Sequence, residues 1–89
     1  MSQPDKLPPA SFSFLIATQA AQISTLLGQT PNPMTGKTEV RLDMAKHFID
    51  TLAILEEKTK GNLTDDEAKL LTVVLHQSRV GYVAAAEKK

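Results

Sequence analysis

Apolar residues recur every three or four positions in three segments of the chain, which is the spacing of one buried face of an α-helix. These segments cover residues 11–27, 42–60 and 65–86. The pattern predicts an all-α fold in which the last two helices form a hairpin and the first, apolar helix packs with them. We expect a single helical domain over residues 11–86.

Each predicted helix carries one broad apolar arc, which we expect to form the core. The opposite side of the second helix is charged, as is typical of a face exposed to solvent. The arc residues are Phe12, Leu15, Ile16, Ala20, Ile23, Leu26 and Leu27 in the first helix, Leu42, Met44, Ala45, Phe48, Ile49, Leu52 and Leu55 in the second, and Ala68, Leu70, Leu71, Val74, Leu75 and Tyr82 in the third.

The short segment between the second and third helices combines a stop signal with a start signal. Gly61 follows the last periodic residues, and Lys60 places a cation near the carboxyl end of the second helix, where the helix dipole favours positive charge. Thr64 is followed three residues later by Glu67, so hydroxyl and carboxylate can each cap a free backbone N–H. Because so short a connection keeps its helices together, an antiparallel hairpin is predicted.

The first helix begins after Ser11, a capping residue, ends at Gly28, and lacks a charged face. Its reverse side is small and weakly polar, and the Ala17-x-x-x-Ala21 spacing would let another backbone come close. A solvated face normally carries Lys or Glu, so this helix is expected to be covered on more than one side. Either it mediates self-association, or its own hairpin sandwiches it. A secretory signal is disfavoured because polar residues interrupt the apolar run.

The reverse side of the third helix carries three valines among polar residues. Val73 and Val80 are seven residues apart and therefore nearly in line along the helix. The valines are either separately exposed residues that need no explanation, or part of a second contact face, against the first helix or another protomer. Gly81 weakens the last turns by about 1 kcal/mol relative to alanine, so we expect fraying beyond it. The candidate interface consists of Phe14, Ala17, Ala21, Val73, Val80 and Val83.

Composition limits the possible functions. Eighty-nine residues with 42% hydrophobic types give one domain with a thin core, for which extra burial in an oligomer would matter. The chain has 10 basic residues (Lys and Arg) and 10 acidic residues (Asp and Glu), so its formal net charge is zero. This neutrality argues against strong electrostatic attraction to nucleic acid or an anionic membrane. The absence of cysteine excludes disulfides and thiolate metal sites. Prolines predict a disordered tail at residues 1–10, and a short tail is expected at 87–89.

The segment Thr35-Gly36-Lys37-Thr38 resembles the end of a phosphate-binding loop. That mechanism needs a glycine where the chain has Pro31, which lacks an N–H group. The following helix also starts too late for its amino end to face a bound phosphate. We therefore predict an ordered turn and no nucleotide or other cofactor.

His47 lies between Asp43 at i−4 and Asp50 at i+3, so the three side chains could approach one another. A metal site needs at least one further ligand, and the Glu-x-x-His pattern of a di-metal bundle is absent. A surface histidine paired with a carboxylate is the preferred interpretation. The alternative is a small ligand- or metal-binding protein or enzyme that uses this group, or His76 with Tyr82.

Several local patterns together resemble a family of small, mostly bacterial proteins known only as domain of unknown function 1844. The resemblance implies a small cytoplasmic all-helical protein and brings no activity, ligand or catalytic residue. It covers residues 12–83. The matching patterns are the uncharged segment ending in Leu27-Gly28, then Pro31-x-Pro33-x-Thr35-Gly36, Ala45-x-x-x-Ile49-Asp50-x-Leu52, Leu55-Glu56-Glu57-Lys58-Thr59-Lys60-Gly61-Asn62-Leu63-Thr64, Glu67-x-x-Leu70-Leu71 and Arg79-x-x-Tyr82-Val83.

The sequence thus favours a non-enzymatic protein interaction module that acts as a homodimer, with a further protein partner possible. A DNA-binding helix-turn-helix is disfavoured because the third helix offers only Lys69 and Arg79 as cations. No catalytic, cofactor or metal residues are assigned.

Overall fold

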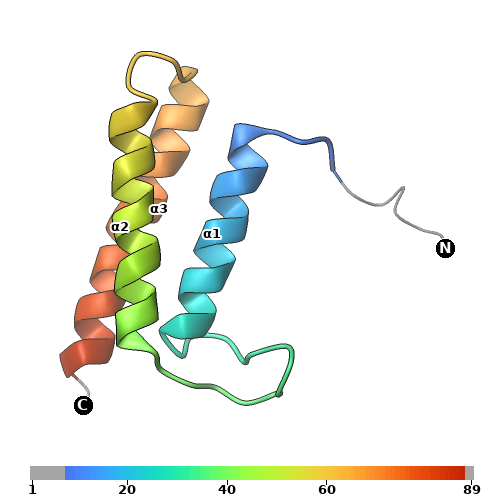
Figure 1. The fold of residues 1–89 in the computed structure, drawn as a ribbon, viewed down its shortest axis with the longest axis vertical. Coiled ribbons are helices and arrows are strands. Elements are labelled where there is room, and N and C mark those ends of the chain that lie inside the picture. The colour runs from blue at the N-terminus through green and yellow to red at the C-terminus, as the bar shows by residue number, and fades with distance from the viewer. Residues whose placement is uncertain (1–7, 88–89) are drawn as a thin grey trace, which may run out of the picture.

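A computed structural model of the protein describes residues 8–87, which form the helices α1 (Phe12–Leu26), α2 (Leu42–Lys58) and α3 (Asp65–Glu87) (Figure 1). The predicted all-α fold with three helices is confirmed. The expectations for the tails at residues 1–7 and 88–89 fall outside the described part of the chain.

The helices alternate in direction along the chain. α2 and α3 run antiparallel and are joined by a short turn, while α1 lies beside this hairpin, parallel to α3 and antiparallel to α2 (Figure 1). Each helix contacts the other two. A long connection after α1 folds back, and the Arg41 N–H donates to the Leu26 carbonyl at 2.7 Å. The predicted hairpin is therefore present, and α1 completes its core.

All three helices contribute to one small core. Its members lie on the predicted arcs. Each leucine or isoleucine side chain among them contributes about 1.5–3 kcal/mol to the stability of the fold when fully buried. Phe12, Phe48, Val74 and Tyr82 are half-buried around it. The buried apolar residues are Ile16, Ile23, Leu27, Ala45, Ile49, Leu52, Leu71 and Leu75.

Three predicted core residues are exposed. Leu15 is 41% exposed and Met44 38%, because each lies at the margin of its apolar arc, beyond the reach of the neighbouring helix. Ala68 is exposed in the first turn of α3, beside an open hollow at the hairpin end that Leu63 also lines. The arcs are therefore narrower than the periodicity suggested.

The ends of α1 follow the predicted signals. Ser11 Oγ accepts a hydrogen bond from the Phe14 N–H at 3.0 Å. At the other end Gly28 has a φ of +78°, and its N–H donates to the Thr25 carbonyl at 3.1 Å. The Gln29 N–H donates to the Ser24 carbonyl at 2.9 Å, which completes a Schellman cap.

The hairpin turn contains the predicted capping box. The Thr64 N–H donates to Glu67 Oε1 at 2.9 Å, and the Glu67 N–H donates to Thr64 Oγ1 at 3.1 Å. The end of α2 differs in detail, since the helix stops at Lys58 and Thr59 caps it. Gly61 adopts the left-handed conformation, with a φ of +85°, two residues after that cap.

The expected fraying after Gly81 is wrong within the described residues, because α3 continues to Glu87. Gly81 is buried, as is Ser78 three residues before it. A Cβ on Gly81 would lie 3.0 Å from Leu27 Cδ1, so the missing side chain lets the end of α1 approach α3 closely. A bulkier residue would push these segments apart.

Candidate functional site

The outer sides of α1 and α3 together form an exposed apolar surface, which we call the α1–α3 face and define by Phe14, Ala17, Ala21, Val73 and Gln77. Phe14 is 44% exposed and Val73 48%, and the other three are exposed as well. The hairpin covers only the opposite side of α1, so it does not sandwich this helix. Half of the candidate interface thus lies open on α1.

A shallow groove runs between the two helices of the α1–α3 face. It measures about 260 Å³, and its rim includes the small or uncharged side chains of Ala20, Ser24, Val73 and Gln77. Ser24 Oγ donates to Gln29 Oε1 at 3.2 Å, so its hydroxyl already has a partner. Neither Ser24 nor Gln77 was singled out from the sequence, because only the packing of α1 against α3 brings them together.

The α1–α3 face carries no formal charge. α1 contains no Asp, Glu, Lys or Arg. On α3, Lys69 lies one turn before Val73, while Arg79 lines a different groove with residues of α2. The face therefore offers dispersion and hydrophobic contact, and nothing that would steer a charged ligand.

The valines near the end of α3 lie apart from the groove. Val80 is 55% exposed and Val83 53%, and both line a depression with His76 and Arg79. Val83 also borders a hollow of about 190 Å³ between α2 and α3, with Lys46 among its lining residues. The structure thus divides the candidate interface: Val73 adjoins α1, whereas Val83 faces α2.

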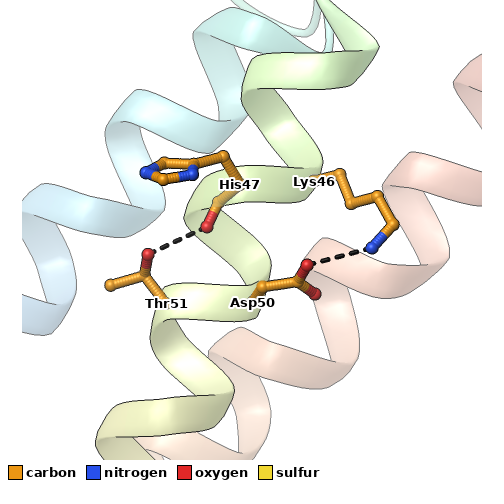
Figure 2. Close-up of polar contacts among 4 residues, drawn as sticks. All are labelled: Lys46, His47, Asp50 and Thr51. Atoms are coloured by element: carbon orange, nitrogen blue, oxygen red, sulfur yellow. Dashed lines mark hydrogen bonds and ion pairs between the residues drawn. The ribbon is translucent and has the colours of Figure 1, made fainter.

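An exposed ion pair lies on the α2 side of that hollow. Lys46 Nζ donates to Asp50 Oδ2 at 2.9 Å, one helical turn away (Figure 2). This hydrogen bond, followed by the Coulombic attraction to Asp50, raises the pKa of Lys46 above its ordinary value. Because Lys46 already neutralises Asp50, this carboxylate is not free to bind another cation.

His47 points away from the Lys46–Asp50 pair, toward the α1 side of α2 (Figure 2). Its carbonyl accepts from Thr51 Oγ1 at 2.9 Å, and its ring meets the Phe48 ring edge-on, with centroids 5.8 Å apart. The predicted pairing of His47 with a carboxylate is not present.

Asp43, the remaining member of the proposed histidine group, lies near Arg41 Nε at 3.8 Å and accepts from the Met44 N–H at 2.8 Å. Asp43, His47 and Asp50 are thus not assembled into one site. Over residues 8–87, no three or more His, Asp or Glu side chains are placed to hold a metal ion.

The segment that resembles a phosphate-binding loop is an ordered turn, as predicted. The Asn32 N–H donates to the Lys37 carbonyl at 2.8 Å, and the Gly36 N–H donates to the Asn32 carbonyl at 2.7 Å. The Met34 N–H is held by Asn32 Oδ1 at 2.8 Å. Because these N–H groups are bonded within the turn, and α2 starts only at Leu42, they do not form a phosphate cradle.

In the part of the chain that the structure describes, none of the helices has the length and hydropathy needed to cross a membrane. The model of the family described as Domain of unknown function (DUF1844) matches residues 9–84. Comparison with curated proteins and with solved structures gave no match.

Proposed function

This chain belongs to the family described as Domain of unknown function (DUF1844), and we propose that it is a non-enzymatic interaction module that forms a homodimer through the α1–α3 face. The observation that carries the proposal is an exposed, charge-free surface centred on α1. Phe14 lies at one end of this surface and Val73 at its α3 side. Solvated helix faces normally carry charged residues, so a surface of this kind favours contact with another protein.

Two physical arguments support a second copy as the occupant. Because the core contains few buried side chains, the free energy gained by apolar burial only slightly exceeds the cost of lost conformational entropy. Burial of more apolar surface in a dimer would increase the net stability. A surface without formal charge also does not repel its own copy, which is compatible with the self-complementary interface of a two-fold dimer.

The dimensions of the α1–α3 face fit a small dimer interface. α1 has 15 residues. Its length is therefore about 22 Å, and two adjacent helices present a surface roughly 20 Å wide. A surface of this extent covers roughly 440 Å² in projection. It is smaller than the roughly 800 Å² per partner of a standard stable interface, so it fits a dimer that dissociates on dilution.

We place this homodimer in the bacterial cytoplasm, the setting that the family resemblance implies. The equal numbers of acidic and basic residues, 10 of each, support a protein partner over nucleic acid. Between residues 8 and 87, Asp43, His47 and Asp50 do not form one group, so the proposal assigns no role to them.

The test replaces Ala17 with Glu and compares it with Ile54→Glu. Both changes introduce one carboxylate at an exposed helical position, but Ile54 is 55% exposed on α2, away from α1. Sedimentation velocity should show a monomer for Ala17→Glu and a dimer for Ile54→Glu, because only the first would bury paired like charges at the dimer interface. Circular dichroism should show equal helicity. Equal sedimentation of the two variants would refute the role of the face.

A further inference from the structure

The hollow between α2 and α3, which we call the α2–α3 hollow, brings together two sequence patterns that are far apart in the chain. One is Ile49-Asp50 on α2, and the other is Arg79-x-x-Tyr82-Val83 on α3. Both are among the patterns that carry the family resemblance, and the α1–α3 face includes neither of them. The lining residues of the α2–α3 hollow are Lys46, Ile49, Asp50, Arg79, Tyr82 and Val83.

Part of this lining is apolar. Ile49 belongs to the core, Tyr82 is half-buried, and Val83 is exposed. The hollow measures about 190 Å³. Since about 150 Å³ is enough to hold benzene, a leucine or valine side chain fits. Clefts that enclose whole small-molecule ligands measure roughly 300–1,000 Å³. The α2–α3 hollow is therefore sized for a single apolar side chain.

The charged part of the lining leaves one cation available. On α2, Lys46 Nζ donates to Asp50 Oδ2 at 2.9 Å, and both side chains extend on the side of the helix that faces α3 (Figure 2). Elsewhere Arg41 pairs with Asp43. Neither of these two ion pairs includes Arg79, and residues 8–87 contain no other. The guanidinium of Arg79 can therefore hold a carboxylate through two parallel hydrogen bonds.

Tyr82 adds a hydrogen-bond donor near these charges. The pKa of Lys46 is raised first by the hydrogen bond and Coulombic attraction to Asp50, and further by a Coulombic effect of Tyr82. The phenol therefore lies close to the ammonium group, at the polar part of the hollow. Its hydroxyl can donate to an anion that Arg79 holds.

We propose that the α2–α3 hollow binds the C-terminal residue of a different protein, with an apolar side chain in the hollow and the α-carboxylate at Arg79. A C-terminal leucine or valine carries both groups on one residue, which a hollow of this size requires. The preceding residues of the partner can lie over the neighbouring depression, which also contains His76 and Val80 and shares Arg79 and Val83 with the hollow. The site does not depend on the proposed homodimer.

NMR titration of the isotope-labelled full chain tests this site. The probe is the tetrapeptide acetyl-Ala-Ala-Ala-Leu with a free carboxylate, compared with the same peptide amidated at its C-terminus. The amides of Ile49, Tyr82 and Val83 should shift with the free acid. Amidation should raise the dissociation constant at least about tenfold, because it removes the charge that the guanidinium holds. Equal binding of acid and amide, shifts confined to other residues, or no saturable shift up to about 10 mM peptide would overturn the proposal.

Two charge-removing variants test the role of Arg79. Arg79→Gln should raise the dissociation constant of the free acid at least about tenfold. Lys69→Gln is the matched control, because it removes an exposed cation from the same helix about 15 Å away. It should change the constant by less than about twofold. Circular dichroism should show equal helicity. Equal losses of binding would overturn the role of Arg79 and indicate non-specific electrostatic attraction.

N-acetyl-leucine distinguishes a protein C-terminus from a free apolar acid, since it carries the same carboxylate and side chain without the preceding residues. The tetrapeptide should bind at least as tightly as N-acetyl-leucine, because its chain can continue over the neighbouring depression. Weaker binding of the tetrapeptide would overturn the assignment to a protein partner and indicate a free carboxylic acid as the ligand.

Discussion

The backbone of Gly81 on α3 lies directly against the side chain of Gln29, which follows the end of α1. A Cβ built on Gly81 would come within 2.6 Å of Gln29 Nε2 and 3.0 Å of Leu27 Cδ1. Gln29 Oε1 also accepts a hydrogen bond from Ser24. The glutamine therefore links the last turn of α1 with α3, and the absence of a side chain at Gly81 makes room for it.

We expect Gly81→Ala to show a coupling with Gln29. Alanine gains about 1 kcal/mol of helix propensity, but its Cβ displaces the amide of Gln29 in the wild-type background. In a Gln29→Ala background that conflict disappears, so Gly81→Ala should be more favourable there by roughly 0.5–1 kcal/mol. Urea unfolding of the four proteins measures this coupling energy.

The matched control is Gly61→Ala in the same two backgrounds, because no atom lies within 4 Å of a Cβ there. Its effect should not depend on Gln29. Additive free energies for Gly81→Ala and Gln29→Ala would show that the close approach has no energetic consequence.

Leu52→Ala should destabilise the protein by about 2–5 kcal/mol. Leu52 is 0% exposed at the centre of the core, and truncation leaves a cavity as well as losing burial. Ile54→Ala, two residues later on the same helix, should cost less than about 1 kcal/mol, since Ile54 is 55% exposed. Thermal unfolding at one fixed protein concentration compares the two. Similar losses of stability in the two variants would mean that Leu52 and Ile54 are not buried and exposed, respectively, as the structure has them.

Thr64→Ala should lower the free energy of unfolding by about 1 kcal/mol. It removes the hydroxyl that accepts from the Glu67 N–H at 3.1 Å and leaves that group without its cap. Thr72→Ala, at an exposed position further along α3, serves as the control. Amide hydrogen exchange should also accelerate in the first turn of α3. Unchanged protection of the Glu67 amide would contradict the cap.

The Lys46–Asp50 pair should stabilise the fold slightly at neutral pH and lose its effect in alkali. The hydrogen bond to Asp50 raises the pKa of Lys46 in the folded state. A raised lysine pKa stabilises the folded state below the unfolded value, about 10.4, and the effect disappears as pH rises through the folded value. The small Tm difference between wild type and Lys46→Gln should therefore be constant from neutral pH to about pH 9 and shrink above the lysine pKa. A difference that grows in alkali would contradict the pairing.

Local signals along the chain predicted the helices and most of their ends. The hydroxyl of Ser11, the left-handed Gly28 and the Thr64–Glu67 pair each act on backbone groups within five residues. Because their partners are close in sequence, these features need no knowledge of the tertiary fold.

Features that depend on neighbouring helices were harder to predict. Periodicity places Leu15 and Met44 on an apolar arc, but the width of the covered arc depends on how closely the next helix approaches. From the sequence alone, Gly81 is expected only to weaken its helix. The structure shows that its missing side chain also makes room for Leu27 and Gln29. The candidate site shows the same limit, since the α1–α3 groove exists only through packing.

The most direct test of the account is the mass of the unmodified protein in solution, measured by light scattering across a range of concentrations. A homodimer predicts twice the 9.7 kDa of one chain, with dissociation on dilution governed by the α1–α3 face. A mass of one chain at every concentration, up to the solubility limit, would contradict self-association.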